Sequence, residues 1–553
     1  MSFASPLPPV NIPDVSLFDY VLGSLEEDDL ERVAFIDAAR GTRMTFRELR
    51  DRVTAAAGAL AARGIAPGQV VALHALNGPD YAVGFFGLLR AGAAVTTMPA
   101  LATAQDIARQ LAASGAVALI LDPAIAAHAL AGAQAAGLPT ERVIFLREPE
   151  SGESASAGAG DAHHPVLSEL IARGLPAPEL TSLDPATHMA ALPYSSGTTG
   201  RPKGVRLSHR NLVANLAQIE DHLVRRDDVV MAVLPFFHIY GMTVLMNLSL
   251  RRRSTLVTMP RFELAGFLKA HAEYHVTWGF IAPPIAVALA KHPSVDDYDL
   301  SGLRVVFSGA APLDGELGRA LAERLGVAVI QGYGMSEVSP VSHFTPEAYA
   351  AEVSCESVGF AVPNSENLLL DPATGAEIPK PESGVSERGE ICVKGPNVML
   401  GYLDDAAATD AMIDANGFLH TGDIATVDAT GCVTVVDRIK ELIKYKGYQV
   451  APAELEALLL THPGIADAAV IGVHDAAGEE VPKAFVVRQA AAAENGGVLT
   501  EQQVMDFVAE RVAPYKKVRQ VAFIDVVPKS ASGKILRREL RDREAAEDRK
   551  LSR

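Results

Sequence analysis

The sequence LPYSSGTTGRPKGVRLSH, residues 192–209, decides how the rest of the chain is interpreted. It holds a run of small or hydroxyl residues that is closed by Lys203, and the run consists of Ser195, Ser196, Gly197, Thr198, Thr199 and Gly200. Hydroxyl groups and unhindered backbone amides can surround phosphate oxygens, and a lysine adds a positive charge. The spacing GxxxxGK[ST] does not fit, so the segment is not a Walker A loop. By itself it is either a phosphate-binding loop or an ordinary polar turn.

On both sides of this segment, short apolar runs alternate with helical patterns. Residues 70–76 and 117–122 are typical of strands buried on both faces, and residues 81–92 are typical of a helix between them. A new pattern begins near residue 446, where a proline opens an amphipathic helix at 452–463. We therefore expect an α/β protein with a large N-terminal body of α/β sheets over 1–438. A hinge at 439–445 and a small, mobile C-terminal α+β domain over 446–553 are expected to follow.

Charge and cysteine content exclude several functional classes. The chain has 553 residues, with 49 Lys and Arg against 67 Asp and Glu, which gives a net charge of −18 and argues against nucleic-acid binding. Cys355, Cys392 and Cys432 are far apart and have no CxxC spacing or His neighbours in sequence, so they predict reduced thiols and not a zinc site or disulfide framework. The N-terminus lacks signal-peptide features. These features predict a cytoplasmic protein.

Residues 229–250 contain no Asp, Glu, Lys or Arg and are long enough to cross a bilayer. Pro235, His238, Gly241 and Asn247 interrupt the stretch. A buried strand, loop and helix explain these interruptions better than a transmembrane segment does.

Further motifs identify a family. Residues 194–204 resemble the phosphate loop of the adenylate-forming superfamily, which includes acyl-CoA ligases, firefly luciferases and peptide-synthetase adenylation domains. The other motifs of that superfamily are resembled, in its order, by LPFFHIYG (234–241), SGAAPL (308–313), QGYGMSE (331–337), GEICVKGPNVMLGY (389–402), LHTGD (419–423), VDRIKELIKYKGYQVAPAELE (436–456) and PKSASGKILRREL (528–540). Within the superfamily the chain most resembles the 4-coumarate:CoA ligases.

The resemblance implies a two-step reaction with ATP, Mg²⁺ and coenzyme A (CoA). The carboxylate of an acid first attacks the α-phosphate of ATP to give an acyl-adenylate, and CoA then displaces AMP. Glu337 is expected to hold Mg²⁺, Lys534 to bridge the acid and the α-phosphate, and His238 to open or close the carboxylate pocket. The ATP- and AMP-binding set comprises the loop 195–200, Lys203, Gln331, Gly332, Tyr333, Ser336, Asp423, Arg438, Lys440 and Gln449.

The resemblance also implies a moving C-terminal domain, because CoA must enter where the adenylation surface had been. Lys440 occupies the family's hinge position. Lys444, counted among the catalytic residues, and Gln449 match residues that face AMP. Lys446 and Gly447 match the CoA tunnel, and Arg261 lies where relatives carry a basic residue near the CoA phosphates.

The acyl pocket implied by the resemblance is apolar with one phenol, which suits a flat aromatic acid such as a hydroxycinnamate. Its expected residues are Tyr240, Phe307, Ala310, Gly334, Pro340 and Val341. Plant coumarate ligases typically have Met where Phe307 stands, so the larger ring here predicts a preference for cinnamate or 4-coumarate over sinapate.

Alternative functions remain open at this point. A ligase for medium- or long-chain fatty acids or other aryl acids would share the same motifs, and so would a luciferase-like monooxygenase. A binding protein without activity is disfavoured because Lys203, Glu337, Asp423, Arg438 and Lys534 are all intact. An amino-acid-activating module is disfavoured because LPFFHIYG has no Asp and the chain ends at Arg553, which leaves no room for a carrier-protein domain. The expected partners are therefore a carboxylic acid, ATP and CoA.

Overall fold

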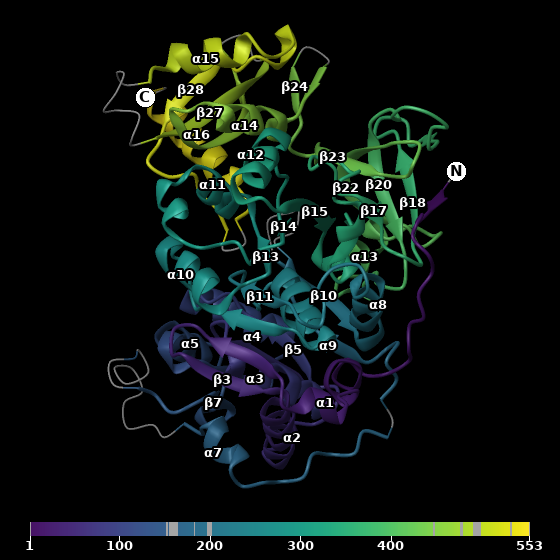
Figure 1. Ribbon diagram of the computed structural model, residues 1–553, viewed down its shortest axis with the longest axis vertical. Helices are drawn as coiled ribbons and strands as arrows, with labels where there is room; N and C mark the ends of the chain where they lie inside the picture. Colours follow the sequence, from purple (N-terminus) through teal and green to yellow (C-terminus); the bar gives the residue numbers. More distant parts are fainter. Residues whose placement is uncertain are drawn as a thin grey trace.

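The computed structural model describes residues 2–150, 153, 164–181, 183–195, 202–445, 448–475, 479–489, 499–530 and 533–551. The chain forms a large N-terminal part, here called the body, and a smaller C-terminal part, here called the lid, at the top of Figure 1. The body contains three sheets, named sheets I, II and III below. This arrangement confirms the expected α/β fold with a large body and a small α+β C-terminal part.

Sheet I is mostly parallel, and helices cover both of its faces. Its strands, in spatial order, are β21 (Gly401–Tyr402), β10 (Lys203–Ser208), β8 (Met189–Ala191), β5 (Ala94–Thr97), β4 (Val70–His74), β6 (Ala118–Leu121) and β7 (Val143–Phe145), with β9 (Tyr194–Ser195) paired to β10. Val71 and Leu73 of β4 pack with α2 (Phe46–Ala62) and α3 (Pro79–Arg90). Ala72, between them, packs with α4 (Ala104–Ser114) and α5 (Ala126–Ala135) on the other face. Successive side chains of a strand point to opposite faces, so an uninterrupted apolar run can fill both layers.

Sheet II carries a parallel centre with antiparallel strands at both ends. Its order is β17 (Phe360–Ala361), β16 (Val341–Phe344), β15 (Ala328–Gly334), β14 (Val305–Ser308), β13 (Trp278–Ile281), β11 (Val229–Ala232), β12 (Thr255–Thr258), β2 (Val33–Asp37) and β3 (Thr42–Thr45). The helices that follow its strands include α9 (Leu248–Arg252), α10 (Leu264–Tyr274), α11 (Pro283–Lys291) and α12 (Gly315–Leu325), and α8 (His209–Ile219) follows β10 of sheet I. One core cluster joins sheets I and II through α3 and α8, so the two sheets form a single packed body.

Sheet III is antiparallel and lies on the right in Figure 1. Its order is β1 (Phe3–Ala4), β18 (Glu366–Leu370), β20 (Gly389–Lys394), β22 (Leu419–Val427) and β23 (Val433–Arg438), with β19 (Glu377–Ile378) on β18. The short helix α13 (Ala406–Met412) precedes β22. Strand β23 ends at Arg438, and the chain then enters the lid.

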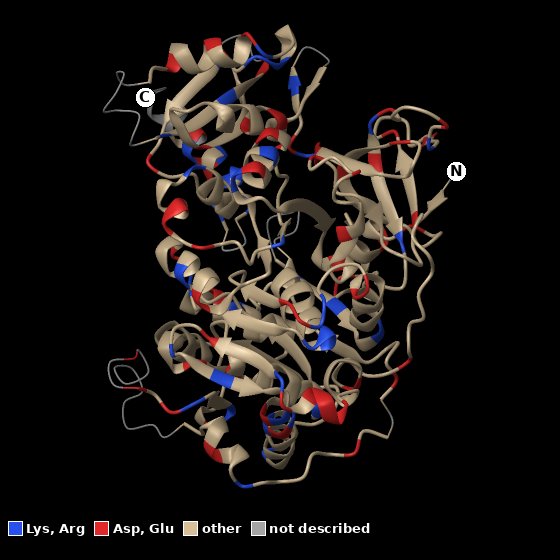
Figure 2. Ribbon diagram, in the orientation of Figure 1, with Lys and Arg blue, Asp and Glu red and all other residues tan. Residues whose placement is uncertain are grey.

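The lid is built on its own sheet of β26 (Ile465–His474), β27 (Glu480–Arg488) and β28 (Gln520–Phe523). A hairpin of β24 (Ile443–Tyr445) and β25 (Tyr448–Val450) precedes it, and the helices are α14 (Pro452–Thr461), α15 (Glu501–Ala509) and α16 (Arg537–Leu551). The predicted helix that begins at Pro452 is therefore present, and strands accompany it as expected for an α+β part. Acidic and basic residues are interspersed over the view in Figure 2 and do not gather into one basic face.

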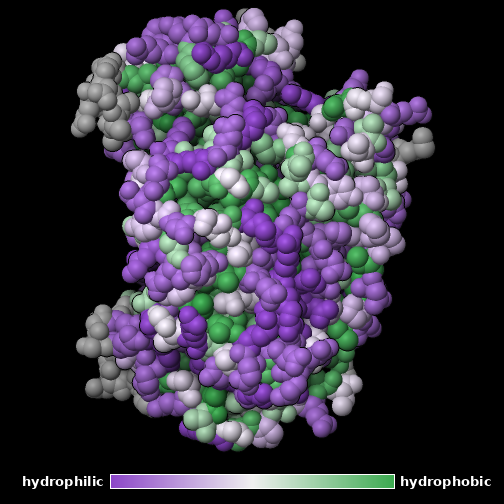
Figure 3. Space-filling view, viewed as in Figure 1, coloured by the Kyte–Doolittle hydropathy of each residue, from purple (hydrophilic) through white to green (hydrophobic). Residues whose placement is uncertain are grey.

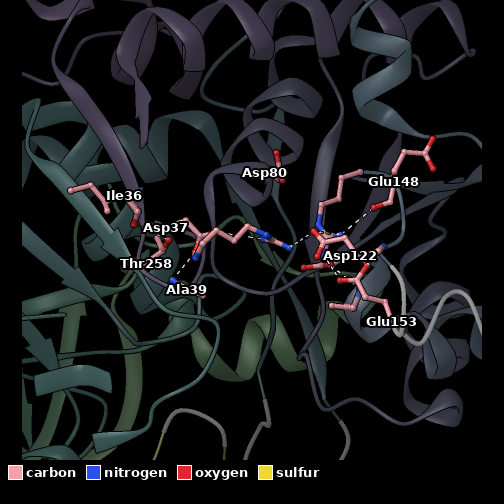
Figure 4. A network of polar contacts seen from close by, with 12 residues as sticks. Ile36, Asp37, Ala39, Asp80, Asp122, Glu148, Glu153 and Thr258 are labelled. Carbon is pink, nitrogen blue, oxygen red and sulfur yellow. Dashed lines mark hydrogen bonds and ion pairs between the residues drawn. The ribbon is translucent and has the colours of Figure 1, made fainter. Parts of the chain in front are cut away.

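A network of ion pairs connects sheets I and II, as shown in Figure 4. Arg147, after β7, contacts Asp122 at 3.2 Å and Glu153 at 2.5 Å. Arg40, in the turn between β2 and β3, contacts Asp37 at 3.4 Å and Glu150 at 3.0 Å. Arg147 also reaches Glu150 at 3.4 Å, so the two arginines share a carboxylate across the sheets.

The uncharged stretch at 229–250 forms β11, an irregular helical segment over Tyr240–Asn247 and α9. Its residues are mostly buried within the body, as the interruptions in the sequence predicted. Nowhere in the described part of the chain is a helix both long and apolar enough to cross a membrane.

Candidate active site

A pocket opens at the carboxyl ends of the central strands of sheet II. Ala310 follows β14, Ser336 follows β15, and Ala282, next to the pocket, follows β13. Crevices at the carboxyl ends of parallel strands are the usual binding places in α/β folds. The described residues that line the pocket are His238, Ile239, Tyr240, Val244, Phe307, Gly309, Ala310, Gly332, Tyr333, Gly334, Met335, Ser336, Pro340, Val341 and Lys534. All six residues predicted for the acyl pocket are in this set.

Glycines keep the walls of the pocket close together. A Cβ on Gly309 would lie 2.8 Å from Tyr240 Cε1. A Cβ on Gly332 would overlap the ring of Phe307, and one on Gly334 would overlap the carbonyl of Pro340. Larger residues at these positions would force neighbouring strands apart, so the glycines set the shape of the pocket.

Aromatic rings form one wall. The Tyr240 and Phe307 ring centroids are 6.4 Å apart, and Tyr240 OH donates to the Phe307 carbonyl at 3.4 Å. Phe280 of β13 supports Phe307 from behind, at 5.4 Å between centroids, and does not line the pocket. Figure 3 shows hydrophobic residues gathered in the middle of the molecule, below the lid.

His238 lines the pocket as a neutral imidazole. Its Nδ1 accepts a hydrogen bond from the Tyr240 backbone N–H at 3.3 Å, which requires a lone pair on that nitrogen. Burial, and then the charge of Lys534, lower the pKa of His238 to about 3. The ring therefore stays uncharged at neutral pH.

Lys534 is the lid's contribution to the pocket. In Figure 1 the yellow chain descends from the lid beside α11. The loop is closed by Ser530 N–H donating to the Lys534 carbonyl at 2.8 Å, and Lys534 N–H donates to Ser530 Oγ at 3.1 Å. Burial and then the charge of Arg438 lower the pKa of the Lys534 ammonium, whereas Asp423 and Glu337 raise it. The lysine is therefore close enough to Asp423 and Glu337 of the body for their charges to act on it.

Gly533 lets this loop approach the body. Its φ is +84°, in the left-handed region that favours glycine. A Cβ there would lie 3.3 Å from Ala282 Cβ, which is tighter than most Cβ contacts, and 3.5 Å from Pro284, which is an ordinary contact.

Asp423, Arg438 and Tyr333 form a second cluster. Asp423 and Arg438 face each other across β22 and β23, with Arg438 Nε 3.3 Å from Asp423 Oδ1. Tyr333 OH donates to Asp423 Oδ2 at 2.5 Å. Burial raises the pKa of the Asp423 carboxyl, and Arg438 and Tyr333 act against that rise. The carboxylate is thus fixed in direction at the edge of the pocket, where its oxygens can accept further hydroxyl groups.

Glu337 and Ser195 form a third cluster, with Tyr402. Ser195 Oγ donates to Glu337 Oε1 at 3.0 Å, and Tyr402 OH donates to the same oxygen at 2.9 Å. Lys203 Nζ lies 4.9 Å from the centre of the Tyr402 ring and 3.9 Å from Asp405 Oδ2. Ser195, the first residue of the Ser/Thr/Gly loop, therefore contacts the Glu337 carboxylate, and Lys203, after the loop, lies over the Tyr402 ring that bonds the same carboxylate.

The Gln331 side chain is bonded to backbone groups of two neighbouring segments. Its side chain accepts from Leu313 N–H at 2.9 Å and donates to the Leu313 and Cys355 carbonyls. With its amide committed to these backbone groups, Gln331 holds the loop 309–313 and does not line the pocket. Ser336 begins a short turn and does line it.

Several predicted residues lie away from the pocket. Lys444 and Gln449 face each other across the β24–β25 hairpin and are exposed, and Lys440 and Arg261 are also exposed. The predicted residues Ser196, Gly197, Thr198, Thr199, Gly200, Lys446 and Gly447 are outside the described residues.

Sequence reasoning missed Tyr402 and Gly533. Tyr402 ends the quoted motif GEICVKGPNVMLGY, but its contact with Glu337 depends on the pairing of β21 with β10. For Gly533, the SASGK spacing next to Lys534 was a usable signal, because a glycine beside a reaching lysine often marks a close backbone approach.

Comparison with known proteins agrees with this geometry. The family model "AMP-binding enzyme" matches residues 25–403, and "AMP-binding enzyme C-terminal domain" matches residues 454–534. The chain is 40% identical to 4-coumarate–CoA ligase 5 of Oryza sativa subsp. japonica over 98% of this chain and 97% of that protein. It is 39% identical to 4-coumarate–CoA ligase 1 of Petroselinum crispum over 99% and 97%.

Among solved structures, ATP-bound MatB from Rhodopseudomonas palustris matches with a TM-score of 0.82 and 29% identity over 96% of this chain and 99% of that one. A benzoate CoA ligase from Burkholderia xenovorans LB400 matches with a TM-score of 0.81 and 25% identity over 95% and 100%.

Proposed function

Because the chain belongs to the AMP-binding enzyme family, we propose that its pocket adenylates a cinnamic-type acid and passes the acyl group to CoA. The chain is an ATP-dependent, AMP-forming acid–thiol ligase. The observation that carries the proposal is that Lys534 of the lid and the aromatic wall of the body line one pocket, with Asp423 and Glu337 in electrostatic range.

The first step joins two anions, the acid's carboxylate and the α-phosphate of ATP. Carboxylate oxygen attacks the α-phosphorus, the bond to the β-phosphate oxygen breaks, and pyrophosphate leaves. Lys534 is proposed to lie between the two anions and to compensate the charge that develops. The narrow glycine-lined walls around it hold the acid in position and exclude water.

The nucleotide is proposed to bind along the remaining clusters. Asp423 would accept the ribose hydroxyls, with Arg438 beside it, and Tyr333 would support the adenine. The loop 195–200 with Lys203 would hold the phosphates, and Gln331 would act indirectly by fixing the adjacent loop.

Mg²⁺ fits the residues around Glu337. A single carboxylate combined with substrate phosphates is an ordinary magnesium site. The Glu337 carboxylate is buried, and its neighbours are the hydroxyls of Ser195 and Tyr402, which can reorient around a cation. When bound there, the ion would neutralise phosphate charge.

In the second step the CoA sulfur attacks the acyl carbon and AMP leaves with the carboxyl oxygen. Residues 439–445 are proposed as the hinge about which the lid turns, with Lys440 within it and 1–438 and 446–553 as the two domains. Lys444, Gln449, Lys446 and Gly447 would then face the reactants, and Arg261 would contact the CoA phosphates. The three free thiols fit a reducing compartment, which supports the cytoplasm as the location.

The acid class follows from the wall of the pocket and from the relatives. Tyr240 and Phe307 offer flat apolar surface, and the relatives named 4-coumarate–CoA ligase match nearly the whole chain. Because a phenyl ring stacks well against such a wall, aromatic acids should be favoured over alkyl acids.

The test is AMP release with ATP, Mg²⁺ and CoA against cinnamate, 4-coumarate, caffeate, sinapate, benzoate, hexanoate and palmitate. We expect the highest kcat/KM with cinnamate or 4-coumarate. A preference for hexanoate or palmitate would overturn the acid class and leave the ligase chemistry in place. ATP–pyrophosphate exchange without CoA separates a failure of adenylation from a failure of transfer.

Phe307→Met tests the wall directly. The shorter, flexible side chain should raise the kcat/KM of sinapate relative to cinnamate by about tenfold, the scale of one or two methylene-sized contacts. Phe280→Met is the matched control, because Phe280 packs against Phe307 from outside the pocket. An equal shift in both variants would mean that general loosening, and not the wall itself, sets the preference.

A further inference from the structure

Three metal-ligand side chains meet on sheet III, away from the pocket. They are Glu390 and Cys392 of β20 and His420 of β22, and their ligand atoms all lie within 4.8 Å of one another. Cys392 and His420 are directly opposite in the strand register, and a register shift lies between Glu390 and Cys392. The cysteine spacing gave no sign of this, because β-pairing brings the histidine to the thiol from 28 residues away.

Two of the three separations between the ligand atoms match those around a tetrahedral zinc ion, and the third, between the Cys392 sulfur and the Glu390 carboxylate, is within 4.8 Å. Bonds of about 2.3 Å to sulfur and about 2.0–2.2 Å to nitrogen and oxygen place sulfur and nitrogen about 3.5 Å apart, and nitrogen and oxygen about 3.4 Å apart. Cys392 Sγ is 3.5 Å from His420 Nδ1, and His420 Nδ1 is 3.2 Å from Glu390 Oε2. The side chains could accept an ion without a large rearrangement.

Hydrogen bonding does not satisfy the cluster fully. The neutral ring of His420 carries either a proton or a lone pair on Nδ1, and both Cys392 Sγ and Glu390 Oε2 approach that one nitrogen. If Nδ1 carries a proton, it donates to the Glu390 carboxylate; if it carries a lone pair, it accepts from the thiol S–H. A bound cation would instead interact favourably with all three ligand atoms at the same time.

The groups around the three side chains resemble those that orient the ligands of a metal site. Glu390 Oε1 accepts the Gly422 backbone N–H at 2.9 Å, which fixes the carboxylate from the side opposite His420, as hydrogen bonds to ligating carboxylates commonly do. Cys392 is fully buried, beside Phe418 and Leu368, whereas the His420 side chain is 31% exposed and gives a path from solvent.

We propose that Glu390, Cys392 and His420 bind one zinc-class divalent ion, with a fourth position open to water. Sulfur, nitrogen and oxygen ligands in this number suit zinc better than magnesium or calcium. On binding, the Cys392 sulfur forms its bond to the metal and its proton leaves to solvent. The ion would tie β20 to β22 three residues before Asp423.

The test uses the full chain, stripped of metal with a chelator and free of nucleotide, titrated with Co²⁺. We expect a thiolate-to-cobalt absorption band that saturates at one equivalent and disappears when Zn²⁺ displaces cobalt, because zinc binds such sites more tightly. The readout is independent of catalysis, so it does not depend on the proposed function.

Variants assign the band to these residues. His420→Gln changes a partly exposed side chain and should raise the Kd for Co²⁺ by at least about tenfold, and Cys392→Ser should abolish the band. Cys432→Ser and Cys355→Ser are matched controls that should keep it. No band in the parent protein, or a band that persists in both His420→Gln and Cys392→Ser, would overturn the proposal.

Discussion

The loop that carries Lys534 and the β24–β25 hairpin belong to the same lid, but their surroundings differ. The loop lies against the body, and Lys534 lines the pocket. The hairpin is open to solvent, with Lys444 and Gln449 exposed and Tyr448 55% exposed.

The two surfaces are attached to opposite faces of the lid's small sheet. Ile443 and Val450 of the hairpin pack with Ala468 and Val470 of β26. Ile535 and Leu540, which follow Lys534, pack with Ala469 and Ile471 of the same strand. Alternate residues of a strand point to opposite faces, so the loop and the hairpin are anchored to opposite sides of one sheet. In the proposed reaction the lid would therefore have to turn as a unit to present the hairpin for the second step.

Lys534→Ala should have the largest effect on the difference in rate between the two half-reactions. Removing the charge between two anions is expected to slow adenylation by about 10²–10³-fold, the usual cost of losing one such stabilising group. Thioester formation from supplied acyl-adenylate should change far less, because the proposed rotation of the lid would by then have removed Lys534 from the pocket. Single-turnover measurement of each half-reaction tests both statements.

Lys529→Ala is the matched control, because Lys529 pairs with Asp467 within the lid at 2.6 Å and is partly exposed. It should slow adenylation by less than about fivefold, as for a surface ion pair. If Lys534→Ala slowed both half-reactions equally, the proposal that Lys534 acts only in adenylation would be contradicted.

Lys444→Ala should show the reverse pattern. Lys444 is exposed while Lys534 lies in the pocket, so removing the Lys444 side chain should spare adenylation. It should slow thioester formation by about 10- to 100-fold, which corresponds to the loss of a charged hydrogen bond. The same two single-turnover assays apply. A selective loss of adenylation would show that the hairpin acts in the first step instead.

Gly533→Ala should weaken docking of the loop. Left-handed backbone costs a residue with a Cβ about 1–2 kcal/mol, so adenylation should fall by about 5- to 30-fold. Gly375→Ala is the matched control: φ is +70° there, and a Cβ would meet nothing within 4 Å. It should carry the same backbone strain with unchanged adenylation, and a similar loss in both variants would reject the docking role of Gly533.

The sequence was sufficient to predict the fold and to select the charged residues that the structure places around the pocket. Buried parallel strands such as 70–76 are recognisable from continuous apolar runs, and Lys534, Asp423 and Glu337 stand in ordered motifs. Contacts across paired strands could not be predicted. The Glu337–Tyr402 bond joins residues 65 apart, and the Cys392–His420 contact depends on a register that sequence spacing does not encode. The contacts of the Gln331 amide with Leu313 and Cys355 could not be predicted either, because a motif gives the position of a residue but not the direction of its side chain.

The pH dependence of adenylation has the smallest expected effect and tests whether Lys534 acts as a buried, charged ammonium group. Burial and the charge of Arg438 lower the Lys534 pKa from the ordinary 10.5, and the role proposed for Lys534 needs the charged form. Activity should therefore fall as pH rises through that lowered pKa, giving an alkaline limb in kcat/KM below pH 10.5. Lys534→Arg should lose the limb, because arginine stays protonated to above about pH 12. The neighbouring phenols Tyr333, Tyr240 and Tyr402 have raised pKa values and should not contribute, so a limb that persists unchanged in Lys534→Arg would mean that Lys534 is not the group whose charge adenylation requires.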